Sequence, residues 1–201
     1  MRFCFTLILF FICSGLMAQR YSFEYWHDGK VVLESGDTIT AKIKYNLQTD
    51  IIQASVNKKI QTYSARKVLF FEIFDGVENR FRQFYSMPYT TSTEYKSPLF
   101  FELLVEGKLT VLCRETLEYR TVPNSFNTFG STQRLVLIFH YFLLKEDGEV
   151  IDIKDTRAIW LDLMEKKAEQ VHKFAKDNKL DFDKKYDLAR IVAYYNSLFK
   201  K

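Results

Sequence analysis

The sequence predicts an α+β fold: an antiparallel β meander of about ten strands, forming a curved sheet or a barrel, then a C-terminal cap of two to three helices. Two observations predict the strands. Apolar and polar residues alternate strictly from Thr38 to Tyr45, and glycine-centred polar turns separate short apolar runs. A third predicts the cap, because apolar spacing becomes helical after residue 154. We expect a signal peptide (1–18), a β-domain (19–154) and a helical cap packed on it (155–201).

The N-terminus has the layout of a secretory signal peptide. Arg2 supplies a positive charge, residues 3–16 form an almost unbroken apolar run, and Ala18 is a small residue where a signal peptidase would cut. So short a run does not span a bilayer comfortably, which disfavours the alternative of an uncleaved anchor. Lipid attachment is disfavoured because Ile12 precedes Cys13. We expect export to the periplasm, outer membrane or exterior, with no transmembrane segment after cleavage.

Composition limits the classes of function. Cleavage leaves 183 of the 201 residues, enough for one ordinary domain, and changes the net charge from +4 to +3. Such a small excess in an exported chain predicts no nucleic-acid partner. Cys113 is the only cysteine left, so no intramolecular disulfide can form. Fifteen Phe, twelve Tyr and two Trp remain, which suits pleated sheets and packed barrels.

Besides the strand at Thr38–Tyr45, nine runs have the length and composition of strands. The run Leu135–Leu144 is apolar on both faces, which indicates a central strand. The nine are Val31–Glu34, Ile51–Val56, Ile60–Tyr63, Val68–Phe74, Arg80–Met87, Leu99–Val105, Leu109–Tyr119, Leu135–Lys145 and Glu149–Ile153.

The connections between these runs are of two kinds. Polar contexts with glycine predict tight turns, because hairpin turns need a positive φ that glycine adopts readily. Tyr89–Pro98 and Val122–Gln133 are longer and polar, and they are candidates for a recognition surface, with simple connectors as the alternative. The glycines in turn-like contexts are Gly29, Gly36, Gly76, Gly107 and Gly148.

Three amphipathic helical segments are expected after Asp155. The first follows a cap at Asp155 or Thr156, the second runs from about Glu165 to Asn178, and the third follows a cap at Asp183. Each must bury an apolar face, and the nearest surface is the sheet. The residues predicted to face it include Ile159, Trp160, Leu163, Met164, Val171, Phe174, Leu188, Ile191, Val192, Tyr195 and Leu198.

Several stretches resemble a group of secreted proteins of Bacteroidetes-type bacteria. They are Trp26–Asp37, Phe71–Asp75, Phe84–Tyr89 and Ser97–Glu102, and the end of the chain, Asp187–Asn196, is similar to the final helix of that group. The resemblance covers most of the chain beyond the signal peptide. It implies an exported β-rich protein with helices at its end, in a Gram-negative envelope, and it implies no catalytic residues.

No motif assigns catalytic, cofactor-binding or metal-ligating residues. The histidines, His27, His140 and His172, are widely separated, and the chain has no HExxH or CxxC motif. His140 interrupts an apolar strand, which favours a buried, hydrogen-bonded histidine, whereas His172 is expected on the surface. Cys113 is in phase with apolar strand residues, so we expect a buried thiol.

Strand carboxylates are the remaining candidates for chemistry. Glycosidase-type carboxylate pairs are defined by their separation in space, so sequence spacing does not exclude them. Glu72, Glu102 and Glu115 lie in or beside predicted strands and are the first suspects, although outward-facing strand residues are the favoured interpretation. No G-x-S-x-G motif or phosphate-binding glycine loop accompanies them.

Three functions therefore stay open. The favoured one is an exported, non-catalytic envelope protein that acts as a binding or structural module for another envelope protein or a surface polymer. The second is a barrel whose aromatic interior holds a small apolar ligand. The third is an unrecognised periplasmic hydrolase, which a pocket with two facing carboxylates would favour.

Overall fold

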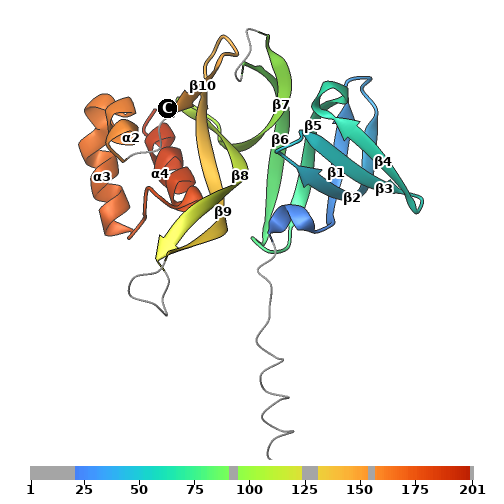
Figure 1. The fold of residues 1–201 in the computed structure, drawn as a ribbon. Helices are drawn as coiled ribbons and strands as arrows, with labels where there is room; N and C mark the ends of the chain where they lie inside the picture. The colour runs from blue at the N-terminus through green and yellow to red at the C-terminus, as the bar shows by residue number, and fades with distance from the viewer. Residues whose placement is uncertain (1–20, 91–94, 124–130, 154–156, 200–201) are drawn as a thin grey trace, which may run out of the picture.

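The computed structural model describes residues 21–90, 95–123, 131–153 and 157–199. Within them, ten antiparallel strands form one sheet in the order β10-β9-β8-β7-β6-β5-β1-β2-β3-β4 (Figure 1). The sheet is not closed, because β4 and β10 are its two edges. The predicted α+β fold is confirmed, and the curved sheet is correct rather than the barrel. The predicted signal peptide, residues 1–18, lies outside the described residues.

All ten predicted strands are present. Two meanders, β1–β4 and β5–β10, are joined where β5 returns to pair with β1 instead of β4. The strands are β1 (His27–Leu33), β2 (Thr38–Asn46), β3 (Ile51–Val56), β4 (Lys59–Ser64), β5 (Val68–Asp75), β6 (Arg80–Tyr89), β7 (Ser97–Val105), β8 (Thr110–Pro123), β9 (Ser131–Leu144) and β10 (Val150–Ile153).

Gly29 is not in a turn as predicted. It lies inside β1, opposite Ala41 of β2 and Ile73 of β5. A Cβ at this position would come within 2.2 Å of the Glu72 carbonyl oxygen and 2.8 Å of Ile43 Cδ1. The glycine is therefore required by the close approach of β1 to β5 rather than by a turn.

The other four glycines lie in the predicted turns, although not all have the expected backbone. Gly36, Gly107 and Gly148 have positive φ angles of 90°, 152° and 83°. In the β5–β6 turn the positive φ belongs to Asn79, at 50°, and not to Gly76. Asp75 closes this turn, since its Oδ1 accepts hydrogen bonds from the Val77 and Glu78 backbone amides.

The two predicted loops are shorter than expected because the strands extend into them. β6 continues to Tyr89 and β7 begins at Ser97, while β8 reaches Pro123 and β9 begins at Ser131. Pairing with the facing strand makes even polar residues such as Thr121 extended, opposite Gln133. The central residues of both loops, 91–94 and 124–130, lie outside the described residues.

Strands β8 and β9 form a long two-stranded arm. They pair with each other at fourteen positions. β7 pairs with β8 only at 111–113, and β10 pairs with β9 only at 141–144. Residues 114–123 and 131–140, which we call the β8–β9 arm, therefore have no other described strand beside them. Figure 1 shows the arm between the helices and the curved part of the sheet.

Strands β1–β7 curve around a core filled by aromatic rings. Phe71 and Phe84 stack with ring centroids 4.5 Å apart, Phe100 meets Phe71 edge-on at 5.1 Å, and Tyr45 lies 5.0 Å from Phe84. All four rings are almost completely buried. We call them the aromatic cluster, and they fill the space that a ligand-binding barrel would need to leave open.

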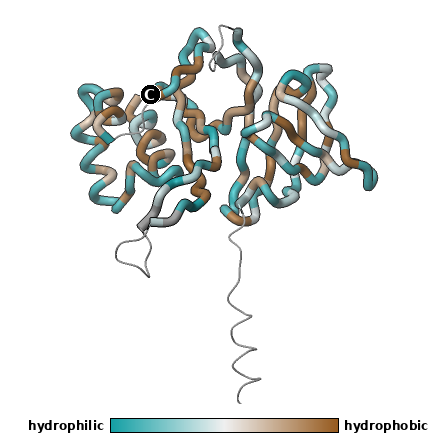
Figure 2. The backbone as a smooth tube through the Cα atoms, in the orientation of Figure 1, coloured by the Kyte–Doolittle hydropathy of each residue, from teal (hydrophilic) through white to brown (hydrophobic). Residues whose placement is uncertain are grey.

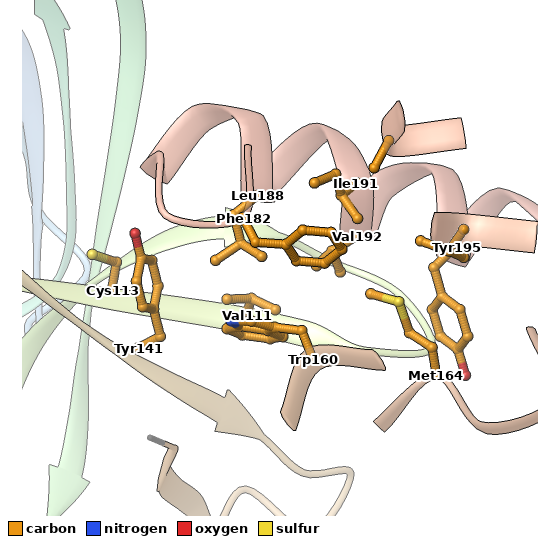
Figure 3. Packing of buried hydrophobic residues seen from close by; sticks show 12 residues of the cluster. Val111, Cys113, Tyr141, Trp160, Met164, Phe182, Leu188, Ile191, Val192 and Tyr195 are labelled. Atoms are coloured by element: carbon orange, nitrogen blue, oxygen red, sulfur yellow. The ribbon is translucent and has the colours of Figure 1, made fainter. Parts of the chain in front are cut away.

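Three helices pack against the other end of the sheet. They are α2 (Arg157–Leu163), α3 (Ala168–Asp177) and α4 (Lys185–Ser197), with a 3-10 turn, η4 (Glu165–Lys167), before α3. Figure 3 shows α2 and α4 enclosing a core with Val111 and Cys113 of β8 and Tyr141 of β9. We call this the helix-covered core. Its other buried members are Trp160, Met164, Val171, Ala175, Phe182, Leu188, Ile191, Val192 and Tyr195.

The helix boundaries differ from the prediction in two places. The second segment does not continue from Glu165, because Glu165 has a φ of 45° and only a 3-10 turn precedes α3. Asp183 does not cap the third helix: the N-cap is Lys184, without a side-chain capping bond. The predicted first cap, Asp155 or Thr156, lies outside the described residues. Phe174 is only partly buried and stacks on Tyr194 at 3.9 Å.

The hydropathy of the chain follows this arrangement. In Figure 2 the hydrophobic stretches run along strands and along helix α4, while the tip of the β3–β4 hairpin is hydrophilic. In the part of the chain that the structure describes, no helix has the length and apolar character needed to cross a membrane.

Candidate functional site

Five charged side chains are buried together where the curved sheet meets the helices. The central one is Arg82 of β6, whose side chain is only 2% exposed. Asp75 of β5, Glu102 of β7 and Glu115 of β8 surround it, and Lys185 at the start of α4 completes the group. We call these five residues the Arg82 cluster. Its two cations and three anions come from five elements of the fold.

The Arg82 guanidinium is hydrogen-bonded on every side. It grips Glu102 with two bonds, Nε to Oε1 at 3.0 Å and Nη2 to Oε2 at 2.6 Å. Nη1 donates to Asp75 Oδ2 at 2.9 Å, and Nη2 donates to Glu115 Oε2 at 3.2 Å. This bidentate hydrogen bonding fixes the orientation of the Glu102 carboxylate as well as its distance from Arg82. A lysine in place of Arg82 would fix only the distance.

Lys185 links the helices to the same carboxylate. Its Nζ donates to Glu102 Oε2 at 2.6 Å, and both side chains are buried. Glu102 therefore receives bonds from a strand residue and from the first turn of α4. The Glu102 carboxylate therefore links the sheet, through Arg82, to helix α4, through Lys185.

Neutral polar groups complete the cluster. The Tyr45 hydroxyl accepts from Arg82 Nη1 at 2.7 Å and donates to Glu115 Oε1 at 2.6 Å. The Ser22 hydroxyl, in the 3-10 turn η2 (Ser22–Glu24), donates to Asp75 Oδ2. The buried His27 ring places Nε2 2.8 Å from the Ser22 carbonyl oxygen. The N-terminal turn is thus tied to the cluster as well.

The pKa shifts of Glu102, Asp75 and Lys185 favour their charged forms. Burial alone would raise the pKa of Glu102, but Arg82 and Lys185 outweigh it and the pKa is lowered. The pKa of Asp75 is lowered in the same way, since bonds from Ser22 and Arg82 overcome its burial. Burial opposes the charge of Lys185, yet Glu102 raises the pKa of that ammonium group above its usual value.

Three members of the Arg82 cluster, Arg82, Glu115 and Lys185, line an open cleft of about 720 Å³. Leu135, Leu137 and Phe139 of β9 form an apolar wall, while charged residues lie around the opening. We call this the Arg82 cleft. Its lining residues are Tyr21, Ser22, Val77, Glu78, Arg82, Glu115, Arg134, Leu135, Val136, Leu137, Phe139, Asp183, Lys184, Lys185 and Tyr186.

Tyr186 is a polar group at this cleft that lacks a partner. Its hydroxyl is buried and makes no hydrogen bond within the described chain. Arg80 stacks over the ring, 3.5 Å from its centroid, and holds it in place. Burial, with a contribution from Glu102, raises the pKa of Tyr186 to about 12, so the hydroxyl keeps its proton and can donate.

A second ion pair ties the β8–β9 arm to the curved part of the sheet. Arg114 of β8 binds Asp50, with Nη1 to Oδ1 at 2.7 Å, and also donates to the Phe100 and Leu47 carbonyl oxygens. Asp50 in turn accepts from the Phe100 amide at 2.7 Å. The arm is thus anchored to the curved part from both of its faces.

The structure separates the three suspected carboxylates. Glu102 and Glu115 come together around Arg82, so the expectation that they face outward is wrong. Glu72 lies on the opposite face of the sheet, paired with Lys30 at 3.2 Å and Gln83 at 2.7 Å. The hydrogen bond from Gln83 is the main reason that the pKa of Glu72 is lowered.

The remaining candidates lie apart from the cluster or beside it. Cys113 is fully buried, as predicted, and burial raises the pKa of its thiol. His140 is not buried: its side chain is 43% exposed and hydrogen-bonds Thr116 and Glu118. His172 is partly exposed beside Arg157. Among the described residues, no group of three or more ligand-type side chains could hold a metal ion.

Sequence reasoning missed Arg82, Asp75, Lys185 and Tyr45 as members of a site. The sequence contains a signal for two of them, Arg82 and Lys185. Arg82 is in strand phase with Phe84, and Lys185 is in helical phase with Leu188, so both occupy inward-facing positions in the pattern. A charge on a predicted inner face is the observation that calls for a buried partner.

Comparison with known proteins gives no relative. No family model matches the chain, and no curated protein or solved structure shows significant similarity to it.

Proposed function

We propose that this protein is an exported cell-envelope protein that binds a partner without transforming it, and that the Arg82 cleft is its binding site. The partner is another envelope protein or a surface polymer. The observation that carries the proposal is an open cleft lined by Arg82, Glu115 and Lys185, which belong to a buried cluster of five charges.

Buried charges are a poor way to stabilise a fold. Removing a charge from water has a cost of several kcal/mol, and apolar replacements of buried ion pairs are often as stable or more stable. What the cluster provides is geometry: Glu102 holds Arg82 of the sheet and Lys185 of α4 at fixed positions. A cleft whose walls are fixed before binding loses less entropy when a partner enters.

The lining of the cleft suits an extended amphipathic chain. Leu137 and Phe139 offer apolar contacts, and the unpaired Tyr186 hydroxyl offers a donor. Arg134 and Lys184 lie on the rim together with Glu78 and Asp183. Mixed charge around an apolar strip is typical of protein-recognition surfaces.

The two alternative functions have less support. The aromatic cluster occupies the interior that a small apolar ligand would need, and the sheet is open. A glycosidase-type hydrolase would need one carboxyl with a raised pKa as a general acid. Glu102 has a lowered pKa and is held by Arg82 and Lys185, so it is poorly placed for that role.

Export is supported by the N-terminal sequence. The apolar run at residues 3–16, with Arg2 before it and Ala18 after it, has the order of a cleaved signal peptide. Intact-mass analysis of the protein from its native host tests this part. Mature protein should begin near Gln19, whereas soluble protein that retains Met1 contradicts export.

Site-specific photocrosslinking in the native host tests the binding site. A photoreactive residue at Val77, in the cleft and 59% exposed, should form a reproducible adduct with an envelope component. The matched control is Ile60 on β4, which is 60% exposed and away from the cleft. Equal labelling from both positions, or none from Val77, contradicts the proposal.

A panel of hydrolase substrates tests the claim that no reaction occurs. We expect the purified wild-type protein to show no turnover that depends on Glu115. Any background turnover should be the same in wild type and in the Glu115→Gln variant. This variant keeps an acceptor for the Tyr45 hydroxyl and so limits structural damage. Turnover that disappears in Glu115→Gln but persists in Glu72→Gln overturns the binding-only function.

A further inference from the structure

The β8–β9 arm has a free backbone edge along residues 131–140 of β9. No described strand pairs there, because β10 ends beside Tyr141. Two hydrogen bonds show which backbone groups point outward. Lys145 N donates to Glu149 O on the β10 side, and Leu135 O accepts from the Tyr21 hydroxyl. Since these groups alternate along a strand, those of Leu135, Leu137 and Phe139 face the free edge.

This edge lacks the usual protection. Exposed edge strands normally carry lysine, proline or a bulge. The β8–β9 pairing has no register shift, and five consecutive apolar residues, 135–139, lie along the free edge. The other fully open strand, β4, is different, with Lys59 and mostly polar exposed residues. An unprotected apolar edge favours pairing with a further β-strand.

We propose that the partner is a second copy of this chain, which pairs antiparallel with β9 about a two-fold axis at Leu137. In this register Leu135 faces Phe139 of the second copy and Leu137 faces its own equivalent, so apolar residues meet on one side. Arg134 faces His140, whose Nε2 lies 3.3 Å from Glu118 Oε1. The two-fold axis therefore brings Arg134 of each copy close to Glu118 of the other, whose Oε2 also lies 3.6 Å from Arg120 Nη2 of its own chain.

The length of the contact matches the gap in the sheet. The paired segment, 134–140, ends where β10 begins to occupy the edge at residue 141. Three facing pairs with outward backbone groups would exchange about six hydrogen bonds, and two of these require the Tyr21 hydroxyl to leave the Leu135 carbonyl oxygen, once in each copy. A self-complementary contact of this kind closes on itself and leaves neither copy with an open β9 edge. The inference rests on the β9 edge and not on the Arg82 cluster, although the side chains of Leu135, Leu137 and Phe139 also line the Arg82 cleft.

Cysteine crosslinking tests the register. In Leu137→Cys the two facing Cα atoms would lie about 5.5 Å apart, within the range for a disulfide. This variant should form a covalent dimer under mild oxidation. Arg134→Cys is the matched control, since the two equivalent positions would be about 20 Å apart, six residues at about 3.3 Å each. The native Cys113 does not interfere because it is fully buried.

Light scattering on the purified full chain over a range of concentrations tests the dimer itself. Wild type should have the mass of a dimer. Arg134→Glu should weaken it by about tenfold, from two lost surface pairs, and adding Glu118→Arg should restore it. A monomer up to the solubility limit, a dimer insensitive to Arg134→Glu, or crosslinking at residue 134 instead of 137 overturns the proposal.

Discussion

Two neighbouring regions share the inner face of β8, and one consists of apolar side chains whereas the other consists of charged ones. Val111 and Cys113 belong to the helix-covered core, which is apolar and closely packed (Figure 3). Glu115, two residues further along the same face, belongs to the Arg82 cluster, where it hydrogen-bonds Tyr45 and Arg82. One strand thus passes from a buried apolar core to a group of buried ions beside an open cleft.

The difference indicates a division of labour. Apolar burial supplies most folding free energy and tolerates many substitutions that preserve volume. Buried ions supply little net stability but demand one geometry. We therefore assign stability to the helix-covered core and orientation of the cleft to the Arg82 cluster. The following predictions test that assignment, in order of decreasing effect.

Removing the helices should have the largest effect. A chain ended after Ile153 loses Trp160, Met164, Leu188 and Ile191, all almost completely buried. At about 1.5–3 kcal/mol each, their loss rivals the whole stability of a domain, about 5–15 kcal/mol. We expect the fragment to aggregate or to lose its cooperative unfolding, as measured by circular dichroism. A soluble fragment with a sharp transition shows instead that the helices are an independent module.

Removing the central cation, Arg82, should have the next largest effect on stability. Arg82→Met leaves Asp75, Glu102 and Glu115 buried with less compensation, which should lower the free energy of unfolding by about 3–5 kcal/mol. Arg80→Met is the control on the same strand, expected to lose about 1 kcal/mol or less with its stacking on Tyr186. Urea unfolding measures both, and equal losses contradict the special role of Arg82.

The acid limb of the stability profile should depend on the Arg82 cluster. Glu102 and Asp75 have lowered pKa values in the folded state, so their contribution is complete above the unfolded values of about 4. It is lost as the pH falls from there through the folded pKa values. A variant with Glu102→Gln and Asp75→Asn should therefore have a flatter profile below pH 4. An unchanged slope shows that these carboxylates are not held ionised by the fold.

Thiol labelling gives the smallest but simplest effect. Cys113 belongs to the helix-covered core and is fully buried, and burial raises the pKa of its thiol. Reaction with a thiol reagent should be slow in the folded protein and fast in denaturant. Rapid labelling of the native protein would place the thiol at the surface. It would contradict the claim that the helix-covered core is closed to solvent.

The sequence predicts the helix-covered core better than the Arg82 cluster. Apolar residues at helical spacing, such as Leu188, Ile191 and Tyr195, predict their own burial, because any apolar surface can cover them. Cys113 follows from strand phase for the same reason. These inferences need only the local pattern, and they are confirmed.

The cluster is harder because charge partners meet through the fold. Arg82 and Lys185 are 103 positions apart in the sequence, yet both bind Glu102. Residue type predicts Glu102 and Glu115 on the outer face, since an isolated strand carboxylate is usually exposed. Gly29 was placed in a turn on composition alone, although the packing of β1 against β5 explains it. In each case the deciding neighbour is distant along the chain.

The most direct test of the central claim combines stability with geometry in one variant. We define the neutral-cluster variant as Asp75→Asn, Arg82→Met, Glu102→Leu, Glu115→Gln and Lys185→Met, which removes every charge of the Arg82 cluster. Its free energy of unfolding should stay within about 2 kcal/mol of wild type, because apolar replacements of buried ion networks are often neutral.

The geometry of that variant is read by spin labels across the cleft, at Val77 and Lys184. In wild type we expect one narrow distance distribution. In the neutral-cluster variant we expect a broad distribution at nearly unchanged stability, because the walls lose the shared contact at Glu102. A distribution as narrow as that of wild type contradicts the claim that the Arg82 cluster orients the cleft.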